Sequence, residues 1–559
     1  MSKIKIAVSL FFGLVIYSST IIGQVQFDWV SKIAGPNNDR GNSVCVNDKT
    51  GEIYVVGSFS ESCGFGNTFG LTTSSFGTDG FIAKYTSNGI CLSASQIKGN
   101  GNDVSVKDIT IDSIGNQYVI GGFNTQVTIG DTTLTGSGGY TDLFIAKYDI
   151  NGNLVWAKRA GGGSLVRTEG NGVVVDSAEN VYVVGSFRGE SFFGSLSVSS
   201  SGTSDSDIFI VKYDSKGNEK WAKSAGSLGV DNGYAITVDD NNGIYISGSF
   251  FGTIVFDGTT ITSKGKDDIF LAKYDTIGVL VWVKDFGGSS IDCAYSIAAE
   301  GTKYMYMAGE YDSYIDFGTT SLTSSNNRDI FISRVNPMDG SILWAKSAGG
   351  SGYDVANRIT TDYAGNAYVT GGVSYSAVFD TTIVPTECGG CSNNGTDLFV
   401  AKYFSDGKFG WVTHAGGELF DDIGEGISVS NDGSEIYFTG FYESDAKFGP
   451  FLLTAFNGQQ TEGFLSKIGL GGSTEISFNK YSISNQVVVF PNPSNGYFKF
   501  TSAYKNKSDV KIYSYDGNLV YHKNIGNSEL INLSCLDSGI YIFQLTNGSE
   551  IYNQKVILE

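Results

Sequence analysis

The sequence predicts an all-β protein, a seven-bladed β-propeller followed by a small C-terminal β-sandwich. The composition is rich in glycine (75 residues), tyrosine (31) and phenylalanine (37) and poor in proline (6), which is typical of short strands joined by tight turns. A repeat with a period of roughly sixty residues, built of alternating strands, runs through most of the chain and fits one blade per repeat. From residue 487 onward the strand pattern changes, which indicates a second domain.

Recurring residue columns define the repeat. A Tyr-x-x-Gly element occurs at Tyr54, Tyr118, Tyr182, Tyr245, Tyr306, Tyr368 and Tyr437. An acid-x-Phe-x-x-base element follows, with its phenylalanine at Phe81, Phe144, Phe209, Phe270, Phe331, Phe399 and Phe464. A tryptophan comes next at Trp156, Trp221, Trp282, Trp344 and Trp411, and Ser93 holds its place in the first repeat. Columns shared by every repeat are interpreted as packing and repeated ion pairs.

The fourth repeat illustrates the expected blade. Residues 234–238, 244–250, 269–274 and 279–284 should form four strands, with a short hairpin at 254–263, because Asn/Asp/Gly turns separate alternating apolar runs. The seventh repeat lacks a final tryptophan strand, whereas the chain begins with one around Trp29. We therefore expect the N-terminal strand to complete the last blade and protect the sheet edges.

The elements Tyr-Val-Val-Gly-Ser-Phe (54–59) and Asp-Gly-Phe-Ile-Ala-Lys-Tyr (79–85) resemble the Bacteroidetes-type β-propeller repeat. The resemblance covers about residues 25–470 and assigns the propeller domain to residues 24–470. It implies the fold and almost nothing about function, because propellers host many unrelated activities.

A linker is expected at 471–486, and the segment 487–559 then opens with Pro-Asn-Pro and ends in Lys-Val-Ile-Leu-Glu. With its Asp-Gly turn at 516–517 and its Gly-Ile-Tyr strand at 539–541, this segment is similar to the type A C-terminal sorting domain of the type IX secretion system. The resemblance implies that the secretion machinery recognises residues 487–559, removes them, and leaves the protein anchored on the surface or released.

Residues 1–23 are expected to be a secretory signal peptide, since Lys3 and Lys5 precede an apolar run that is too short to span a membrane. No other segment could form a transmembrane helix, so the mature chain is expected to be secreted or on the outer cell surface. The net charge of −20 disfavours binding to nucleic acid. Of the seven cysteines, only Cys388 and Cys391 are spaced as a local pair, a candidate disulfide.

The sequence favours a non-enzymatic role in binding, adhesion or protein interaction. Only His414 and His522 are available for histidine-dependent catalysis, and the second lies in the sorting domain. The alternative is a secreted carbohydrate-active enzyme, which needs only two carboxylates, on the loop face or in the central channel. We use loop face for the end of the propeller that carries the loops between second and third strands and the loops between blades.

Two sets of residues on the loop face are candidate sites. Four residues break the repeat and could contact a surface glycan or protein: Arg167, Arg188, Tyr353 and Phe420. An acidic column follows the outer strands at Asp39, Asp103, Asp231, Asp292, Asp354 and Asp422. Each acid could cap its own turn, or the acids could form a calcium-binding ring, although one carboxylate per blade supplies few ligands. No cofactor other than calcium is suggested.

Overall fold

The computed structural model describes residues 25–469, without 67, 74–76, 102, 203–204, 386–394, 418–419 and 457–459. It also describes 487–558, without 491–496, 503–507, 515–518, 527–529, 535, 537–538 and 548–549. The expected signal peptide, the linker 471–486, Cys388 and Cys391 lie outside the described residues. Two units are distinguished, Met1–Gly472 and Ser473–Glu559, and every regular element described in them is a strand. The described part of the chain therefore offers no helix for crossing a membrane.

In the described residues, the first unit contains seven antiparallel sheets, each with a set of four strands that we number as blades one to seven; in four of the sheets a short hairpin adds two further strands. Strands are given from the centre outward. Blade one consists of β2 (Asp39–Asn47), β3 (Glu52–Ser60), β6 (Thr78–Tyr85) and β7 (Cys91–Lys98), and blade two of β8 (Val104–Ile111), β9 (Gln117–Phe123), β12 (Asp142–Tyr148) and β13 (Leu154–Gly161). Blade three consists of β14 (Arg167–Val175), β15 (Val181–Arg188), β18 (Asp207–Tyr213) and β19 (Glu219–Ala225). Blades four and five are β20 (Asn232–Val238), β21 (Ile244–Phe250), β24 (Asp268–Tyr274), β25 (Leu280–Phe286); and β26 (Asp292–Glu300), β27 (Tyr304–Asp316), β28 (Ser321–Val335), β29 (Ile342–Gly349). Blades six and seven are β30 (Val355–Thr361), β31 (Ala367–Ser374), β34 (Thr396–Tyr403), β35 (Phe409–Ala415); and β36 (Ile423–Val429), β37 (Glu435–Tyr442), β40 (Glu462–Gly469), β1 (Gln26–Ala34).

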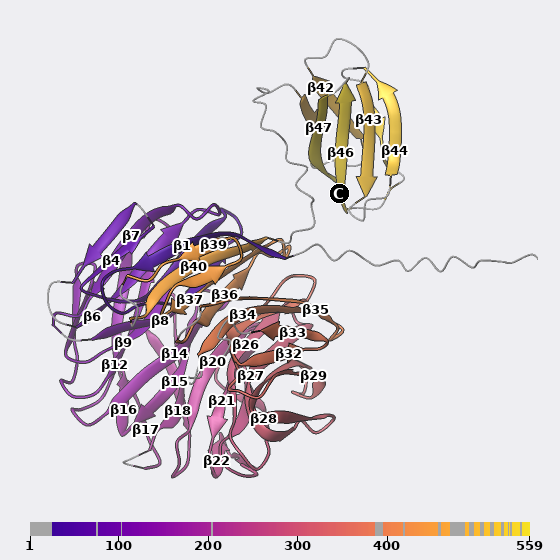
Figure 1. The fold of residues 1–559 in the computed structure, drawn as a ribbon. Helices are drawn as coiled ribbons and strands as arrows, with labels where there is room; N and C mark the ends of the chain where they lie inside the picture. Colours follow the sequence, from indigo (N-terminus) through magenta and orange to yellow (C-terminus); the bar gives the residue numbers. More distant parts are fainter. Residues whose placement is uncertain are drawn as a thin grey trace, which may run out of the picture. The chain divides into compact units, whose positions relative to one another are not determined.

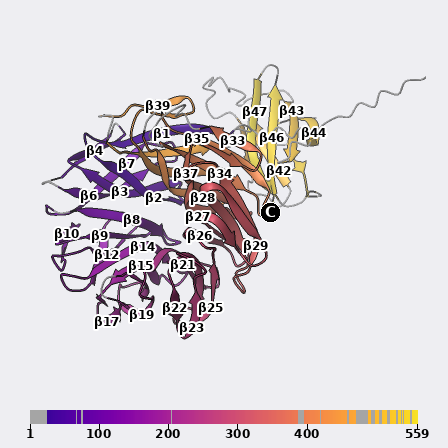
Figure 2. The ribbon, with the colours of Figure 1, turned by 60° about the horizontal axis from the view of Figure 1, so that its bottom comes forward.

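The sheets follow one another around a ring in sequence order (Figures 1 and 2). Each inner strand contacts the inner strand of the next blade, and β36 contacts β2. The N-terminal strand β1 lies beside β40 (Figure 1), with Phe27 opposite Ile468 and Ile33 opposite Gly463. The predicted fold class is therefore confirmed, including closure of the last blade by the N-terminal strand.

Short hairpins on the loop face fasten neighbouring blades to each other. They are β4 (Ser62–Phe65) with β5 (Phe69–Thr72), β10 (Gln126–Ile129) with β11 (Thr132–Thr135), β16 (Glu190–Phe193) with β17 (Leu196–Ser199), β22 (Thr253–Phe256) with β23 (Thr259–Thr262), β32 (Ser376–Phe379) with β33 (Thr382–Pro385), and β38 (Ala446–Phe448) with β39 (Phe451–Leu453). Four of the hairpins pair with the outer strand of the preceding blade, through the contacts β1–β4, β7–β10, β13–β16 and β29–β32. In blade five the corresponding hairpin is continuous with β27 and β28.

The repeated glycine of the Tyr-x-x-Gly element is required by the closeness of the first two strands. A Cβ on Gly248 would lie 1.8 Å from the Asn232 carbonyl oxygen and 2.7 Å from the Phe270 ring. Gly57 meets the Arg40 carbonyl at the same 1.8 Å. Any larger residue would force the strands apart, so this column is a packing requirement.

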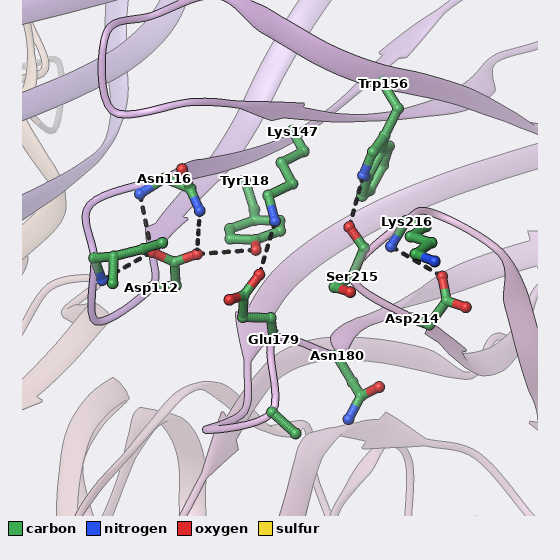
Figure 3. A network of polar contacts seen from close by, with 12 residues as sticks. Asp112, Asn116, Tyr118, Lys147, Trp156, Glu179, Asn180, Asp214, Ser215 and Lys216 are labelled. Carbon is green, nitrogen blue, oxygen red and sulfur yellow. Dashed lines mark hydrogen bonds and ion pairs between the residues drawn. The ribbon is translucent and has the colours of Figure 1, made fainter.

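The other columns also hold the blades together, through a polar network at the opposite end of the strands, which we call the turn face. Asp112 caps the turn between β8 and β9 by accepting hydrogen bonds from its own turn amides and from the Tyr118 hydroxyl, the latter at 3.1 Å (Figure 3). Lys147, in the base column, pairs with Glu179 of the next blade at 3.1 Å. These residues support the structural interpretation of the repeat columns.

Where an outer strand carries a tryptophan, that side chain packs against the following blade. Trp156 donates its indole N–H to the Ser215 carbonyl at 3.1 Å (Figure 3), and its ring packs on Gly217. Ser93 occupies the same register in blade one, opposite the base column. A cavity of about 50 Å³ lies beside it, and a Cβ on Gly152, the counterpart of Gly217, would have no atom within 4 Å.

The second unit has two described sheets. One contains β41 (Val487–Phe490), β42 (Tyr497–Ser502) and β45 (Ile531–Asn532); the other contains β44 (Leu519–Ile525), β43 (Ser508–Ser514), β46 (Gly539–Asn547) and β47 (Glu550–Leu558). Their core includes Phe498, Val510, Ile512 and Phe543, which are buried because alternate strand residues face inward. This arrangement fits the predicted small sandwich.

Candidate functional site

The loop face carries three arginine side chains that each lie against an aromatic ring. Arg40 on β2 is 4.1 Å from the Phe441 ring centre. Arg188 at the end of β15 is 5.6 Å from the Tyr140 ring, and Arg328 on β28 is 5.7 Å from the Tyr353 ring. Tyr140 and Tyr353 are about half exposed, at 46% and 54%. Guanidinium groups stacked on rings are held in place while their donors stay available to a ligand.

Of the four predicted ligand residues, the structure brings two together. Arg167 and Arg188 lie directly opposite each other on β14 and β15, where like charges repel. Arg167 is compensated by Glu169, whose two carboxylate oxygens each accept a hydrogen bond at 2.8 Å. Tyr353 lies in the loop before β30, beside Arg328. Phe420 lies in the loop before β36 with a φ of 68°, a conformation that strains a non-glycine residue.

Blade five extends the Arg328 pair into a larger cluster. Arg328 forms an ion pair with buried Glu310, and Glu310 accepts a hydrogen bond from the Tyr295 hydroxyl at 3.0 Å. The Tyr295 ring packs on Tyr234 of blade four, with ring centres 5.0 Å apart. The cluster therefore joins aromatic surface to a fixed cation near the loop-face mouth of the channel.

The central channel also departs from sevenfold regularity. Each inner strand has a β-bulge, and the residues after the bulges are Ser43, Asp108, Gly172, Ala235, Ser296, Arg358 and Gly426. Arg358 of blade six reaches across to blades one and two, where it pairs with Asp108 and donates to Ser43 at 3.0 Å. Ser43 in turn donates to Asp108 at 2.7 Å. These three residues form a charged bridge across the middle of the channel.

The turn-face half of the channel is a polar cavity of about 320 Å³. The Arg358 bridge and the hydroxyl groups of Ser296, Thr237 and Ser428 line it, with Asp48 and Glu300 among the lining acids. Burial, followed by the nearby carboxylates of Asp240, Asp362 and Asp48, raises the pKa of Glu300 to about 7. Glu300 is therefore partly protonated at neutral pH.

The acidic column is buried rather than open to the loop face. Asp39, Asp231, Asp292, Asp354 and Asp422 are all fully buried. Each accepts backbone hydrogen bonds from its own loop, as Asp231 does from Ser227 at 2.6 Å, and Asp231 also accepts from Phe251 at 2.9 Å. These contacts match the turn-capping interpretation and tie each blade-to-blade loop to the end of the second strand.

Asp103 does not belong to this column. Val104 occupies the equivalent position in blade two, opposite Phe123, as Asp39 is opposite Phe59. Asp103 is exposed and accepts a hydrogen bond from the Thr78 amide at 3.0 Å.

Sequence reasoning missed that each column acid has an acidic neighbour. The neighbour lies on the third strand of the preceding blade, two residues before its repeated phenylalanine, in the pairs Glu462/Asp39, Asp207/Asp231, Asp268/Asp292, Asp329/Asp354 and Asp397/Asp422. Burial, and to a smaller extent the neighbouring carboxylate, raise the pKa of Asp39 and of Asp292 to about 8. Burial in the same way raises the pKa of Asp231 to about 7 and of Asp354 to about 6. Each blade contributes at most one acid to the column. Among the described residues, no group of three or more His, Cys, Asp or Glu side chains is arranged to hold a metal ion.

Comparison with known protein families assigns both parts of the chain. Residues 488–559 match the secretion system C-terminal sorting domain, and residues 155–186 and 343–371 match the beta-propeller repeat. The chain thus contains beta-propeller repeats and a type IX secretion system C-terminal sorting domain. The sorting domain marks it for export by the secretion machinery, to the cell surface or the medium.

Individual relatives are distant. An uncharacterized WD repeat-containing protein of Acanthamoeba polyphaga mimivirus is 27% identical over 450 residues, covering 64% of this chain and 32% of that protein. The regulatory protein FlaEY of Caulobacter vibrioides is 26% identical over 211 residues, covering 36% of this chain and 22% of its own. This chain thus spans about a third or less of these relatives.

Similarity to solved structures is also low. The WD40 repeats of RRP9 match at a TM-score of 0.39 and 9% identity, covering 79% of this chain and 100% of that one. Quinohemoprotein alcohol dehydrogenase from Comamonas testosteroni matches at 0.38 and 11%, covering 80% and 77%.

Proposed function

We propose that the exported propeller is a binding module that attaches to an acidic glycan through its loop face and so acts in adhesion. The three arginine–aromatic pairs, Arg40/Phe441, Arg188/Tyr140 and Arg328/Tyr353, carry this proposal. Guanidinium groups bind carboxylate and sulfate in a bidentate manner, and aromatic faces pack on sugar rings. In a chain of net charge −20, this concentration of stacked arginines favours an anionic ligand.

The test is binding of the full chain to an array of immobilised glycans, both uronate- or sulfate-bearing and neutral. We expect acidic glycans to be preferred. Arg328→Gln should weaken binding about 10- to 100-fold, because a hydrogen bond between charged groups contributes about 1.5–3 kcal/mol. Arg188→Gln should have an effect in the same direction.

Arg334→Gln is the matched control. Arg334 also lies over an aromatic ring, 5.0 Å from Tyr304, but it belongs to the turn end of blade five, where it donates to the Ser405 carbonyl at 2.7 Å. It should leave glycan binding unchanged. Equal binding of neutral and acidic glycans, or equal losses in Arg328→Gln and Arg334→Gln, would remove the proposal.

A second function has one observation in its favour, the cavity containing Glu300 and Asp48. A carboxyl group with a pKa of about 7 suits a general acid, and a neighbouring carboxylate could supply the second group of a glycosidase. This pair would act in the turn-face half of the channel and not on the loop face. A hydrolysis screen that shows activity in the natural chain and none in Glu300→Gln would establish it.

A further inference from the structure

The contacts between blades three to six contain buried carboxylate oxygens that have no hydrogen-bond partner. They are Oδ1 of Asp207, Asp268, Asp292 and Asp329. Asp268 and Asp292 are both 0% exposed. Oδ2 of Asp268 accepts an amide hydrogen bond from Lys264 at 2.9 Å, and Oδ2 of Asp292 accepts one from Gly288 at 2.8 Å, with the Asp312 main chain also close to the Asp292 carboxyl. A buried charged group without a partner costs several kcal/mol, so either a bound proton or a cation has to neutralise these pairs.

The paired acids come close enough to share that group. At the contact between blades five and six, a Cβ on Gly349 would lie 2.7 Å from Asp329 Oδ1 and 2.9 Å from Asp354 Oδ2. Two carboxylates from different blades thus approach the same glycine, which has no side chain to keep them apart.

At the contact between blades two and three, the protein itself supplies the cation that neutralises the buried acid. There the column residue is Thr168, and Asp142 is neutralised by Arg159 at 3.0 Å. Arg159 lies on the outer strand opposite Phe144. The equivalent positions in blades three to five are Ser224, Asp285 and Ser347, none of which is a cation.

We propose that the acid pairs Asp207/Asp231, Asp268/Asp292 and Asp329/Asp354 each bind one divalent cation, calcium in an extracellular setting, which bridges adjacent blades. Carboxylate oxygens from two blades, completed by main-chain carbonyls and water, are ligands that calcium accepts. Asp285 and Asp312 add negative charge around the middle pair, and Lys264 is the nearby cation. The cation takes the place that Arg159 holds one blade earlier.

The experiment is a calcium titration of the chelator-treated full chain by calorimetry, with Tm recorded in calcium and in chelator. We expect about three bound ions. Each should raise Tm by about 3 °C when free calcium exceeds Kd a hundredfold, given the entropy of unfolding of a propeller this long. Asp292→Asn should lose one of the three ions, whereas Asp142→Asn, at the arginine-neutralised contact, should keep all three.

A gain-of-charge variant guards against misfolding of the asparagine variants. Ser347→Arg places a guanidinium at the position that Arg159 occupies, so it should keep the fold and displace one ion. No binding at millimolar calcium, with a Tm that responds to pH and not to calcium, would show that the pairs share a proton and would overturn the proposal. An unchanged ion count in both Asp292→Asn and Ser347→Arg would overturn it equally.

Discussion

Replacing Ser93 by tryptophan should stabilise the propeller, because blade one has the cavity but lacks the indole that fills it in other blades. Ser93 lies opposite Lys84, as Trp156 lies opposite Lys147. The cavity of about 50 Å³ beside Ser93 is lined by Tyr54, Tyr148 and Gly152 among others. In blades three to seven the indole packs against the equivalent tyrosine, as Trp221 does with Tyr182 at 6.0 Å.

The expected gain is about 2 kcal/mol. Filling the cavity contributes about 1.2 kcal/mol at roughly 24 cal/mol per Å³. A new hydrogen bond from the indole to the Ile150 carbonyl, the counterpart of the Trp156–Ser215 bond, contributes about 1 kcal/mol. For a propeller of this length the entropy of unfolding corresponds to about 1 kcal/mol per degree, so Tm should rise by about 2 °C.

Differential scanning calorimetry of the natural chain, Ser93→Trp and Ser93→Ala measures this effect. The alanine variant should leave Tm unchanged, since it fills nothing. Trp221→Ser, the reverse change in blade three, should lower stability by about 3 kcal/mol or more. A Tm that stays constant or falls in Ser93→Trp, with Ser93→Ala unchanged, would refute the view that the blades share one packing requirement.

Three further predictions concern the channel and the strand contacts. Arg358→Met should destabilise the fold by about 3–5 kcal/mol in denaturant titrations, because it leaves Asp108 buried without its cation, and adding Asp108→Leu should restore most of the loss. Burial raises the pKa of Glu300 from its ordinary value of 4.5 to about 7. The contribution of protonated Glu300 to stability is therefore complete below pH 4.5 and is lost as pH rises through 7. Tm should fall between pH 5 and pH 8, and it should fall less in Glu300→Gln. Gly248→Ala should prevent folding or lower Tm strongly, since its Cβ would meet a carbonyl at 1.8 Å, while Gly258→Ala, with open space around it and a φ of 90°, should cost only about 1 kcal/mol by thermal melting.

The sequence was sufficient for the fold because each blade repeats residues that the backbone itself requires. Gly248 fits only where two strands nearly touch, and Trp156 fits only where the next turn offers a carbonyl and a glycine. Such requirements recur wherever the geometry recurs. Closure by the strand at Trp29 followed from the same rule, since one blade lacked an outer strand and the N-terminus had a spare one.

The candidate sites could be predicted only in part, because they depend on contacts between blades. The sequence placed Arg188 and Tyr353 on the loop face, but the partners Tyr140 and Arg328 come from neighbouring loops and strands. The Arg358 bridge depends on the β-bulges of the inner strands, which change the direction of the side chains at the channel. The sequence contains no turn residues that would have predicted these bulges.

Under the proposed calcium binding, a repeated position is a ligand site as well as a structural one. Two acidic columns, each explained separately by turn capping, come together only when the third strand of one blade packs beside the inner strand of the next. Where the protein provides a cation, as Arg159 does for Asp142 and Lys32 does for Glu462 at 3.1 Å, one acid of the contact is neutralised by the protein itself. Where Ser224, Asp285 or Ser347 occupies the position of Arg159, the protein supplies no cation there, and ions from solution have to neutralise the paired acids. Stability of blades three to six should therefore depend on the ions around the exported protein, while the contact between blades two and three should not.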